Sequence, residues 1–89
     1  MKKKSPYQVG KKYLIRTVTH YYTGRLVSVF RQELVLEDAA WIADTGRFAT
    51  AIKSGKLNEV EPMSGRVVVG RGAIIDASIW EHSLPNAQK

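Results

Sequence analysis

Short runs of β-branched and aromatic residues recur along this 89-residue chain, and they constrain its fold more than any other feature. Strands are predicted near 13–22, 25–31, 33–42, 66–70 and 73–80, with a shorter candidate within 56–62. A single short helix is predicted near 45–54. Asp44 or Thr45 can cap its N-terminus, and Gly55 can end it. Because parallel strands need crossover helices, one short helix disfavours a parallel βαβ fold.

The residues between these runs predict where the sheet turns. Thr23-Gly24 is predicted as the turn after the first strand, and Met63-Ser64-Gly65 as a later turn. Arg31-Gln32-Glu33 is either a tight connection or the point where one long strand bends around a barrel. The pattern therefore predicts a mostly β fold, a small and strongly bent barrel with one minor helix.

The net charge of +6 lies at the N-terminus. Residues 1–16 contain six basic and no acidic side chains, and the rest of the chain contains eight of each. Such an arm can attract polyanions by counterion release, or it can be a solvated tail that aids solubility. We predict a basic, flexible arm over 1–12, a folded domain over 13–82 and a C-terminal tail over 83–89.

Composition argues against several functional classes. The chain has no Cys, which excludes disulfides and thiolate metal sites. His20 and His82 are its only histidines, a thin supply for a zinc site or a His-based catalytic site. No apolar run approaches the ~20 residues that span a membrane, and no signal peptide opens the chain. We expect a soluble, intracellular domain without a metal or cofactor.

The titratable residues also argue against catalysis. Glu37 and Asp38 are adjacent, so they are predicted to point to opposite faces of a strand. Asp38 is expected to close a turn or accept a backbone amide hydrogen bond, and Asp44 to cap the helix. His20 is expected to be a packed or surface residue, and His82 has no evident partner. We therefore predict that the protein is not an enzyme.

Two segments resemble the paired motifs of Sm-like proteins. The first is Gly24-Arg25-Leu26 followed by Leu34-Val35-Leu36-Glu37-Asp38-Ala39, similar to the family's G-x-L and L-x-L-x-D-A strands. The second is Val67-Val68-Val69-Gly70-Arg71-Gly72-Ala73-Ile74-Ile75, a hydrophobic strand that ends in Arg-Gly before another apolar strand. The resemblance implies a five-stranded Sm-like barrel with the helix between strands 3 and 4. It also implies a homo-oligomeric ring joined by edge-strand pairing.

Departures from the family bear on RNA binding. The family's RNA-binding loop carries an Asp and an Asn, whereas this chain has Arg31-Gln32-Glu33 at that point. Arg71-Gly72 is the part of the implied RNA pocket that is present. Arg71 can contact a phosphate or stack on a base, or it can pair with an acid on a neighbouring chain. The candidate stacking platforms are Tyr21, Tyr22, Phe30, Trp41 and Trp80, although most of them are expected to be core or interface residues. Tyr21-Tyr22 is the pair least easily assigned to a core, and Tyr22 is kept as the candidate for RNA binding.

The segments DAAWIADTGRF, EVEP and WEHSLP also resemble small proteins of phages and mobile elements. We therefore predict a non-enzymatic, ring-forming structural or adaptor module with a phage or host protein as partner. The alternative is a ring that binds RNA weakly through Arg71, Gly72, Tyr22 and five lysines of the arm: Lys2, Lys3, Lys4, Lys11 and Lys12. Both predictions place the protein in the cytoplasm of a bacterial cell or phage-infected host.

Overall fold

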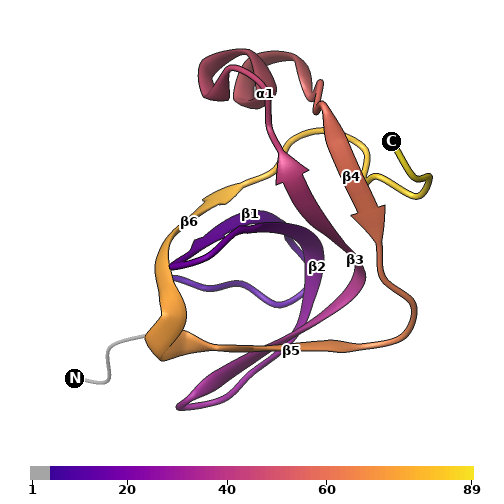
Figure 1. The fold of residues 1–89 in the computed structure, drawn as a ribbon. Coiled ribbons are helices and arrows are strands. Elements are labelled where there is room, and N and C mark those ends of the chain that lie inside the picture. Colours follow the sequence, from indigo (N-terminus) through magenta and orange to yellow (C-terminus); the bar gives the residue numbers. More distant parts are fainter. Residues whose placement is uncertain (1–4) are drawn as a thin grey trace.

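A computed structural model describes residues 5–89, which form six β-strands and one α-helix (Figure 1). The strands are β1 (Lys12–Thr17), β2 (Tyr21–Val29), β3 (Glu33–Asp44), β4 (Glu59–Pro62), β5 (Val67–Gly70) and β6 (Ile74–Ile79). Helix α1 (Phe48–Ser54) joins β3 to β4, and a 3₁₀ turn, η1 (Arg71–Ala73), joins β5 to β6. The predicted mostly β fold is confirmed, as is the placement of its helix. The short candidate within 56–62 contains β4, so the described chain has six strands rather than five.

The sheet is antiparallel and is organised around β3. The strand order is β4-β3-β2-β1-β6, and β5 pairs with β3 outside this path. The first residues of β3, 33–36, pair with β5, whereas 40–44 lie beside β4. The sheet curls so that β1 and β2 lie inside the curve formed by β3, β5 and β6 (Figure 1). Within the described residues β5 and β6 do not pair with each other, so the sheet is open.

The first hairpin differs from the sequence prediction. A strand over 13–22 with a turn at Thr23-Gly24 was expected, but the chain turns at 18–20, and both turn candidates lie inside β2. Thr17 closes the actual turn. Its hydroxyl donates to the carbonyl oxygen of His20 at 2.7 Å and accepts from the His20 N–H at 3.1 Å. A turn closed by a threonine side chain needs no glycine. The sequence pattern therefore predicted the turn at the next glycine, Gly24, several residues after its actual position.

The ends of α1 match the prediction at one terminus only. Gly55 ends the helix in the left-handed conformation, with φ 77°, as predicted. The N-terminal cap position is Arg47, without a side-chain hydrogen bond, so the prediction of Asp44 or Thr45 is wrong. The Asp44 carboxylate instead accepts the N–H of Gly46 at 2.8 Å, in a turn that precedes the helix.

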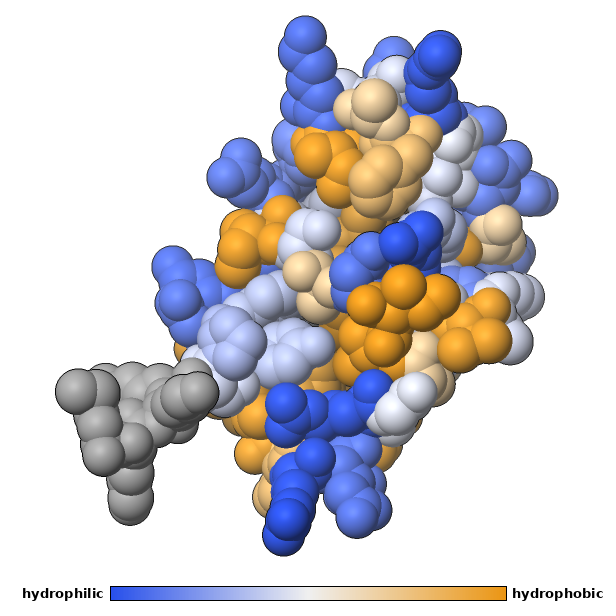
Figure 2. All heavy atoms as spheres, turned by 90° about the vertical axis from the view of Figure 1, so that its left-hand side faces the viewer, coloured by the Kyte–Doolittle hydropathy of each residue, from blue (hydrophilic) through white to orange (hydrophobic). Residues whose placement is uncertain are grey.

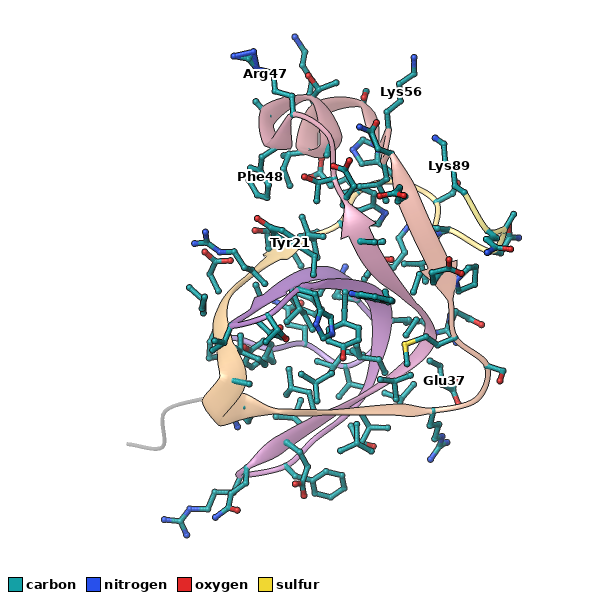
Figure 3. The ribbon with its side chains drawn as sticks, viewed as in Figure 1. Tyr21, Glu37, Arg47, Phe48, Lys56 and Lys89 are labelled. Carbon is teal, nitrogen blue, oxygen red and sulfur yellow. The ribbon has the colours of Figure 1, made fainter. Side chains whose placement is uncertain are left out.

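Two hydrophobic cores lie on opposite faces of the sheet. Because side chains alternate along a strand, Tyr13 and Ile15 of β1 enter one core and Leu14 enters the other. The buried residues of the first core are Tyr13, Ile15, Leu26, Leu34, Leu36, Ala39 and Val69. Those of the second are Leu14, Ala40, Ile42, Ala51, Leu57, Val60 and Trp80. Helix α1 covers the second core through Ala51, and outside it Phe48 contacts Tyr21 with ring centroids 6.0 Å apart (Figure 3).

The C-terminal residues 81–89 fold back onto the molecule. Lys89 exchanges two backbone hydrogen bonds with Val60, of 2.9 and 3.0 Å, and so covers the outer edge of β4 (Figure 3). The Nε2 of His82 donates to the carbonyl oxygen of Ile52 at 2.7 Å. The expectation that His82 lacks a partner is therefore wrong, because this imidazole ties the segment after β6 to the helix.

Gly24 provides a test of how closely β2 and β3 pack. A Cβ on this residue would lie 3.1 Å from the Cβ of Leu36, whereas one on Gly70 would meet nothing within 4 Å. We predict that Gly24→Ala lowers the free energy of unfolding by ~1–3 kcal/mol through overpacking. Gly70→Ala should change it by less than ~0.5 kcal/mol. Urea unfolding of both variants checks this, and equal midpoints would show that the contact at Gly24 is unimportant.

Candidate functional site

Arg71 and Gly72 lie in η1, at the corner between β5 and β6. The Arg71 guanidinium donates to the carbonyl oxygen of Phe30 at 2.8 Å and lies 5.4 Å from the ring centroid of Tyr7. These contacts connect the corner to the β2–β3 hairpin and to the N-terminal segment. A side chain added at Gly72 would meet nothing within 4 Å, so no close contact inside the chain requires a glycine there. A phosphate or base would have to compete with the internal partners of Arg71.

The lysines of the predicted arm fall into two groups. Lys2, Lys3 and Lys4 lie outside the described residues. Lys11 is exposed, whereas the Lys12 ammonium donates to the carbonyl oxygen of His82. The carbonyl of Lys11 also accepts the N–H of Leu26 at 2.9 Å, which holds this part of the chain beside β2. Only Lys11 among the described arm lysines is exposed and has no side-chain hydrogen bond or ion pair within residues 5–89.

Tyr22 lies at the opposite end of β2 from the Arg71 contacts. Tyr22 is the second residue of β2. Phe30, whose carbonyl oxygen accepts the hydrogen bond from Arg71, follows the last residue of the same strand. The structure therefore does not bring the predicted stacking residue and the predicted phosphate-binding residue together. Tyr22 instead lines a surface hollow of about 310 Å³, here called the aromatic pocket, with His20, Trp41, Glu61, Pro62 and Met63.

The rings of the aromatic pocket stand at steep angles to one another. The His20 ring lies 4.6 Å from Tyr22 at 62° and 5.5 Å from Trp41 at 72°, centroid to centroid. Trp41 is 42% exposed, although a tryptophan in a thin core was expected to be a core or interface residue. Tyr22 and Trp41 were among the predicted stacking platforms, but the pocket itself was not predicted, because its residues come from a turn and three separate strands.

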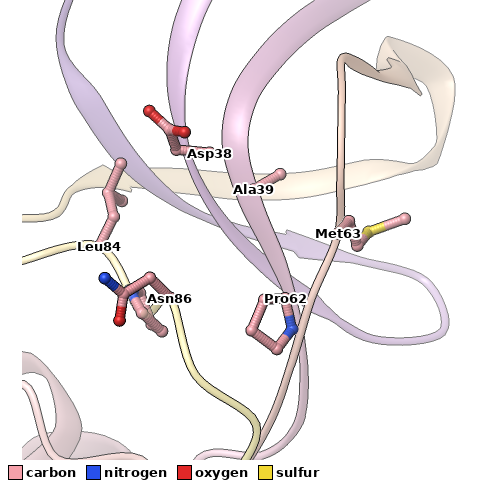
Figure 4. Close-up of a pocket in the computed structure, with 7 residues that line it drawn as sticks. Asp38, Ala39, Pro62, Met63, Leu84 and Asn86 are labelled. Atoms are coloured by element: carbon pink, nitrogen blue, oxygen red, sulfur yellow. The ribbon is translucent and has the colours of Figure 1, made fainter.

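A larger hollow, of about 460 Å³, adjoins the aromatic pocket (Figure 4). Asp38 and Ala39 of β3 line one side, Pro62 and Met63 another, and residues 84–86 of the C-terminal segment the third. The one carboxylate in the lining of this larger hollow is that of Asp38, which forms an ion pair with Arg25. Pro62 and Met63 line both hollows, so the end of β4 separates them.

Glu37 and Asp38 bind the same arginine. Arg25 contacts Glu37 at 3.2 Å and Asp38 at 2.5 Å, and Arg66 contacts Glu37 at 3.1 Å. The prediction that these carboxylates point to opposite faces is wrong, because Asp38 adopts a left-handed φ of 51° that breaks the alternation of β3. The hydrogen bond to Asp38 raises the pKa of the Arg25 guanidinium above its ordinary value. The solvent-exposed ion pairs of Arg25 link β2 and β3 at the point where the alternation of β3 breaks, and exposed pairs of this kind contribute little to stability.

Within the part of the chain that the structure describes, β4, β5 and β6 each have an edge with no strand beside it. The outer edge of β4 is covered by Lys89, whereas the outer edges of β5 and β6 have no second partner within residues 5–89. Exposed apolar side chains mark both strands: Val68 is 63% exposed on β5, and Ile75 and Ile79 are 56% and 48% exposed on β6. Hydrophobic side chains gather among polar ones on the face that includes β6 (Figure 2).

Comparison with protein-family models, with curated proteins and with solved structures finds no match to this chain. The Sm-like family and the phage or mobile-element origin thus stay predictions from the sequence motifs. Within residues 5–89 no group of three or more His, Cys, Asp or Glu side chains is placed to hold a metal ion. In the same part of the chain, none of the helices has the length and apolar character to cross a membrane.

The contacts of Arg71 predict a structural effect of its removal. We expect Arg71→Ala to lower the free energy of unfolding by ~1–2 kcal/mol, because a hydrogen bond and a cation–π contact are lost. Arg31→Ala, in the exposed hairpin tip, is the matched control and should change it by less than ~0.5 kcal/mol. Thermal or urea unfolding measures both. An unchanged stability in Arg71→Ala would mean that the guanidinium is available to an external ligand.

Proposed function

We propose that this protein is a non-enzymatic structural or adaptor module that assembles with copies of itself through the edges of β5 and β6. One observation carries the proposal. The C-terminal segment covers the outer edge of β4, but nothing in residues 5–89 covers the edges of β5 and β6. An uncovered edge presents a row of backbone donors and acceptors, which a strand of another chain can satisfy.

The two edges differ, and this determines the type of assembly. If β5 of one copy pairs with β6 of the next, each copy uses two different surfaces, so the contact is heterologous and closes into a ring when the rotation permits. Val68, Ile75 and Ile79 would then be buried between copies. In this proposal β1, β2, β3, β5 and β6 are the five strands of an Sm-like barrel, and β4 is an addition beside the second half of β3.

The proposal that the protein is not an enzyme is supported by the partners of three of its carboxylates. Asp76 pairs with Arg16 at 2.5 Å, and the carboxylates of Glu37 and Asp38 both contact Arg25. A general acid or base must reach a substrate proton directly, and these side chains are held by arginines on the surface. An adaptor would instead use its remaining surface to hold a phage or host protein.

Weak RNA binding is the second candidate, and the charge of the N-terminal segment favours it. Substituting Gln for Lys2, Lys3 and Lys4 should reduce the salt slope of single-stranded RNA binding by ~2 units, at ~0.7 per lysine. Arg71→Ala should leave that slope nearly unchanged, because its guanidinium already has partners in the fold. Filter binding over a range of salt concentrations measures both. A slope that falls only in Arg71→Ala would assign RNA to the corner at η1.

The assembly itself is tested by placing charge on the edges. We predict that the native protein has a mass in solution that is a multiple of 10.0 kDa, and that Val68→Lys or the pair Ile75→Lys and Ile79→Lys returns it to 10.0 kDa. Val9→Lys is the matched control, since Val9 is as exposed as Val68 but lies outside both strands. Light scattering over a range of concentrations measures the mass. A native protein that stays monomeric at every concentration would refute the proposal.

A further inference from the structure

The aromatic pocket combines π-faces with a carboxylate on one face of the sheet. Tyr22 lies opposite Trp41 in the β2–β3 register, and Trp41 lies opposite Glu61 in the β3–β4 register. Side chains of directly opposed residues project from the same face and approach to about 5 Å at their Cβ atoms. His20 closes the row from the turn before β2, and its ring contacts both Tyr22 and Trp41.

Glu61 has no cationic partner within the described residues. The ion pairs of residues 5–89 involve Asp76, Glu37 and Asp38 but not Glu61. Its one side-chain hydrogen bond there comes from the neutral amide of Gln88, at 3.2 Å. The pocket lining contains no Lys or Arg. The lining therefore joins one carboxylate to the rings of Tyr22, Trp41 and His20, with no Lys or Arg among them.

We propose that the aromatic pocket binds a methylated lysine side chain of a partner polypeptide. An aromatic face attracts a cation through its quadrupole, and quaternary ammonium groups are the usual ligands of such aromatic enclosures. Tyr22 and Trp41 supply the π-faces, and Glu61 supplies the balancing charge. The site is built from β2, β3 and β4, so this inference goes beyond the proposed assembly and does not depend on the edges of β5 and β6.

The chemistry of the lining favours a methylated ammonium over other cations. An unmodified lysine ammonium has three N–H donors, and it would exchange water for a lining with one carboxylate and mostly apolar surface. A trimethylated ammonium keeps the positive charge but has no donor to satisfy. Its methyl groups also bury apolar surface against Trp41, Pro62 and Met63, which line the same hollow.

The position and charge of the pocket favour a protein side chain over a nucleic acid. A phosphate would be repelled by Glu61, and the lining has no Lys or Arg to hold it. The volume of about 310 Å³ is at the small end for a site that encloses a whole ligand, but it suffices for the end of one side chain. The peptide backbone of the partner would stay outside, along the surface of the sheet.

The test uses three short glycine peptides that differ only at the central residue, which is trimethyllysine, lysine or a neutral tert-butyl analogue of trimethyllysine. Binding to the full chain is followed by NMR at the indole N–H of Trp41, with the indole of the buried Trp80 as a folding reference. We expect saturable shifts at Trp41 with trimethyllysine. The neutral analogue and unmodified lysine should bind about tenfold more weakly or worse.

Variants of the pocket should weaken binding of the trimethyllysine peptide, and matched variants nearby should not. Binding by the variants is measured by isothermal titration calorimetry, because Trp41→Ala removes the NMR reporter. We expect Trp41→Ala to abolish it and Glu61→Gln to weaken it about three- to tenfold. Phe48→Ala removes an aromatic ring of similar exposure, and Glu59→Gln a carboxylate of the same strand, so both should bind normally. If Trp41→Ala disturbs the Trp80 signal, the isosteric Glu61→Gln variant decides.

Three results would overturn the proposal. Equal affinity for the neutral analogue would show that the pocket recognises only apolar bulk. Tighter binding of phosphocholine than of the trimethyllysine peptide would assign the pocket to a lipid headgroup or a free choline compound. Shifts at Trp41 that arise with a single-stranded oligoribonucleotide, but not with the peptide, would assign it to base stacking.

Discussion

The sharp bend of β3 at Asp38 is the feature on which the rest of this structure depends. Asp38 has a φ of 51°, a conformation that most non-glycine residues avoid but that aspartate tolerates comparatively well. Its carboxylate is held by Arg25 on the neighbouring strand, and Arg25 also contacts Glu37. These contacts cross-link β2 and β3 on either side of the bend. A straight β3 would have one outer partner, whereas the bent strand has β5 along one half and β4 along the other.

The bend also explains why so small a chain has two cores. On one side of it β3 contributes Leu34 and Leu36 to the core inside the curled sheet. On the other side Ala40 and Ile42 enter the second core, which α1 and the C-terminal segment cover. A small domain buries a limited share of its surface, so burial on both faces of one sheet increases what each strand contributes. The C-terminal segment also covers the edge of β4, so that within residues 5–89 the uncovered edges are those of β5 and β6.

The sequence predicted those elements whose causes are local. The strands and the glycine that ends α1 follow from residue type and spacing, and both are found where the pattern placed them or near it. The first turn was predicted at Thr23-Gly24 because glycine usually marks a turn, but Gly24 is needed for contact with Leu36. The direction of Asp38 and the aromatic pocket depend on the register between strands. A single sequence does not encode that register in any local pattern, so neither could be predicted.

The two halves of β3 place the proposed assembly surface and the proposed binding pocket on different neighbours. The first half pairs with β5, whose outer edge would join the next copy, and the second half carries Trp41 beside Glu61 of β4. Assembly would therefore leave the pocket of each copy accessible. A pocket that encloses one side-chain end gains little affinity alone, but several copies in one ring raise the effective concentration for a partner with several such side chains. The proposed single-residue site and the proposed self-assembly would thus complement each other in an adaptor.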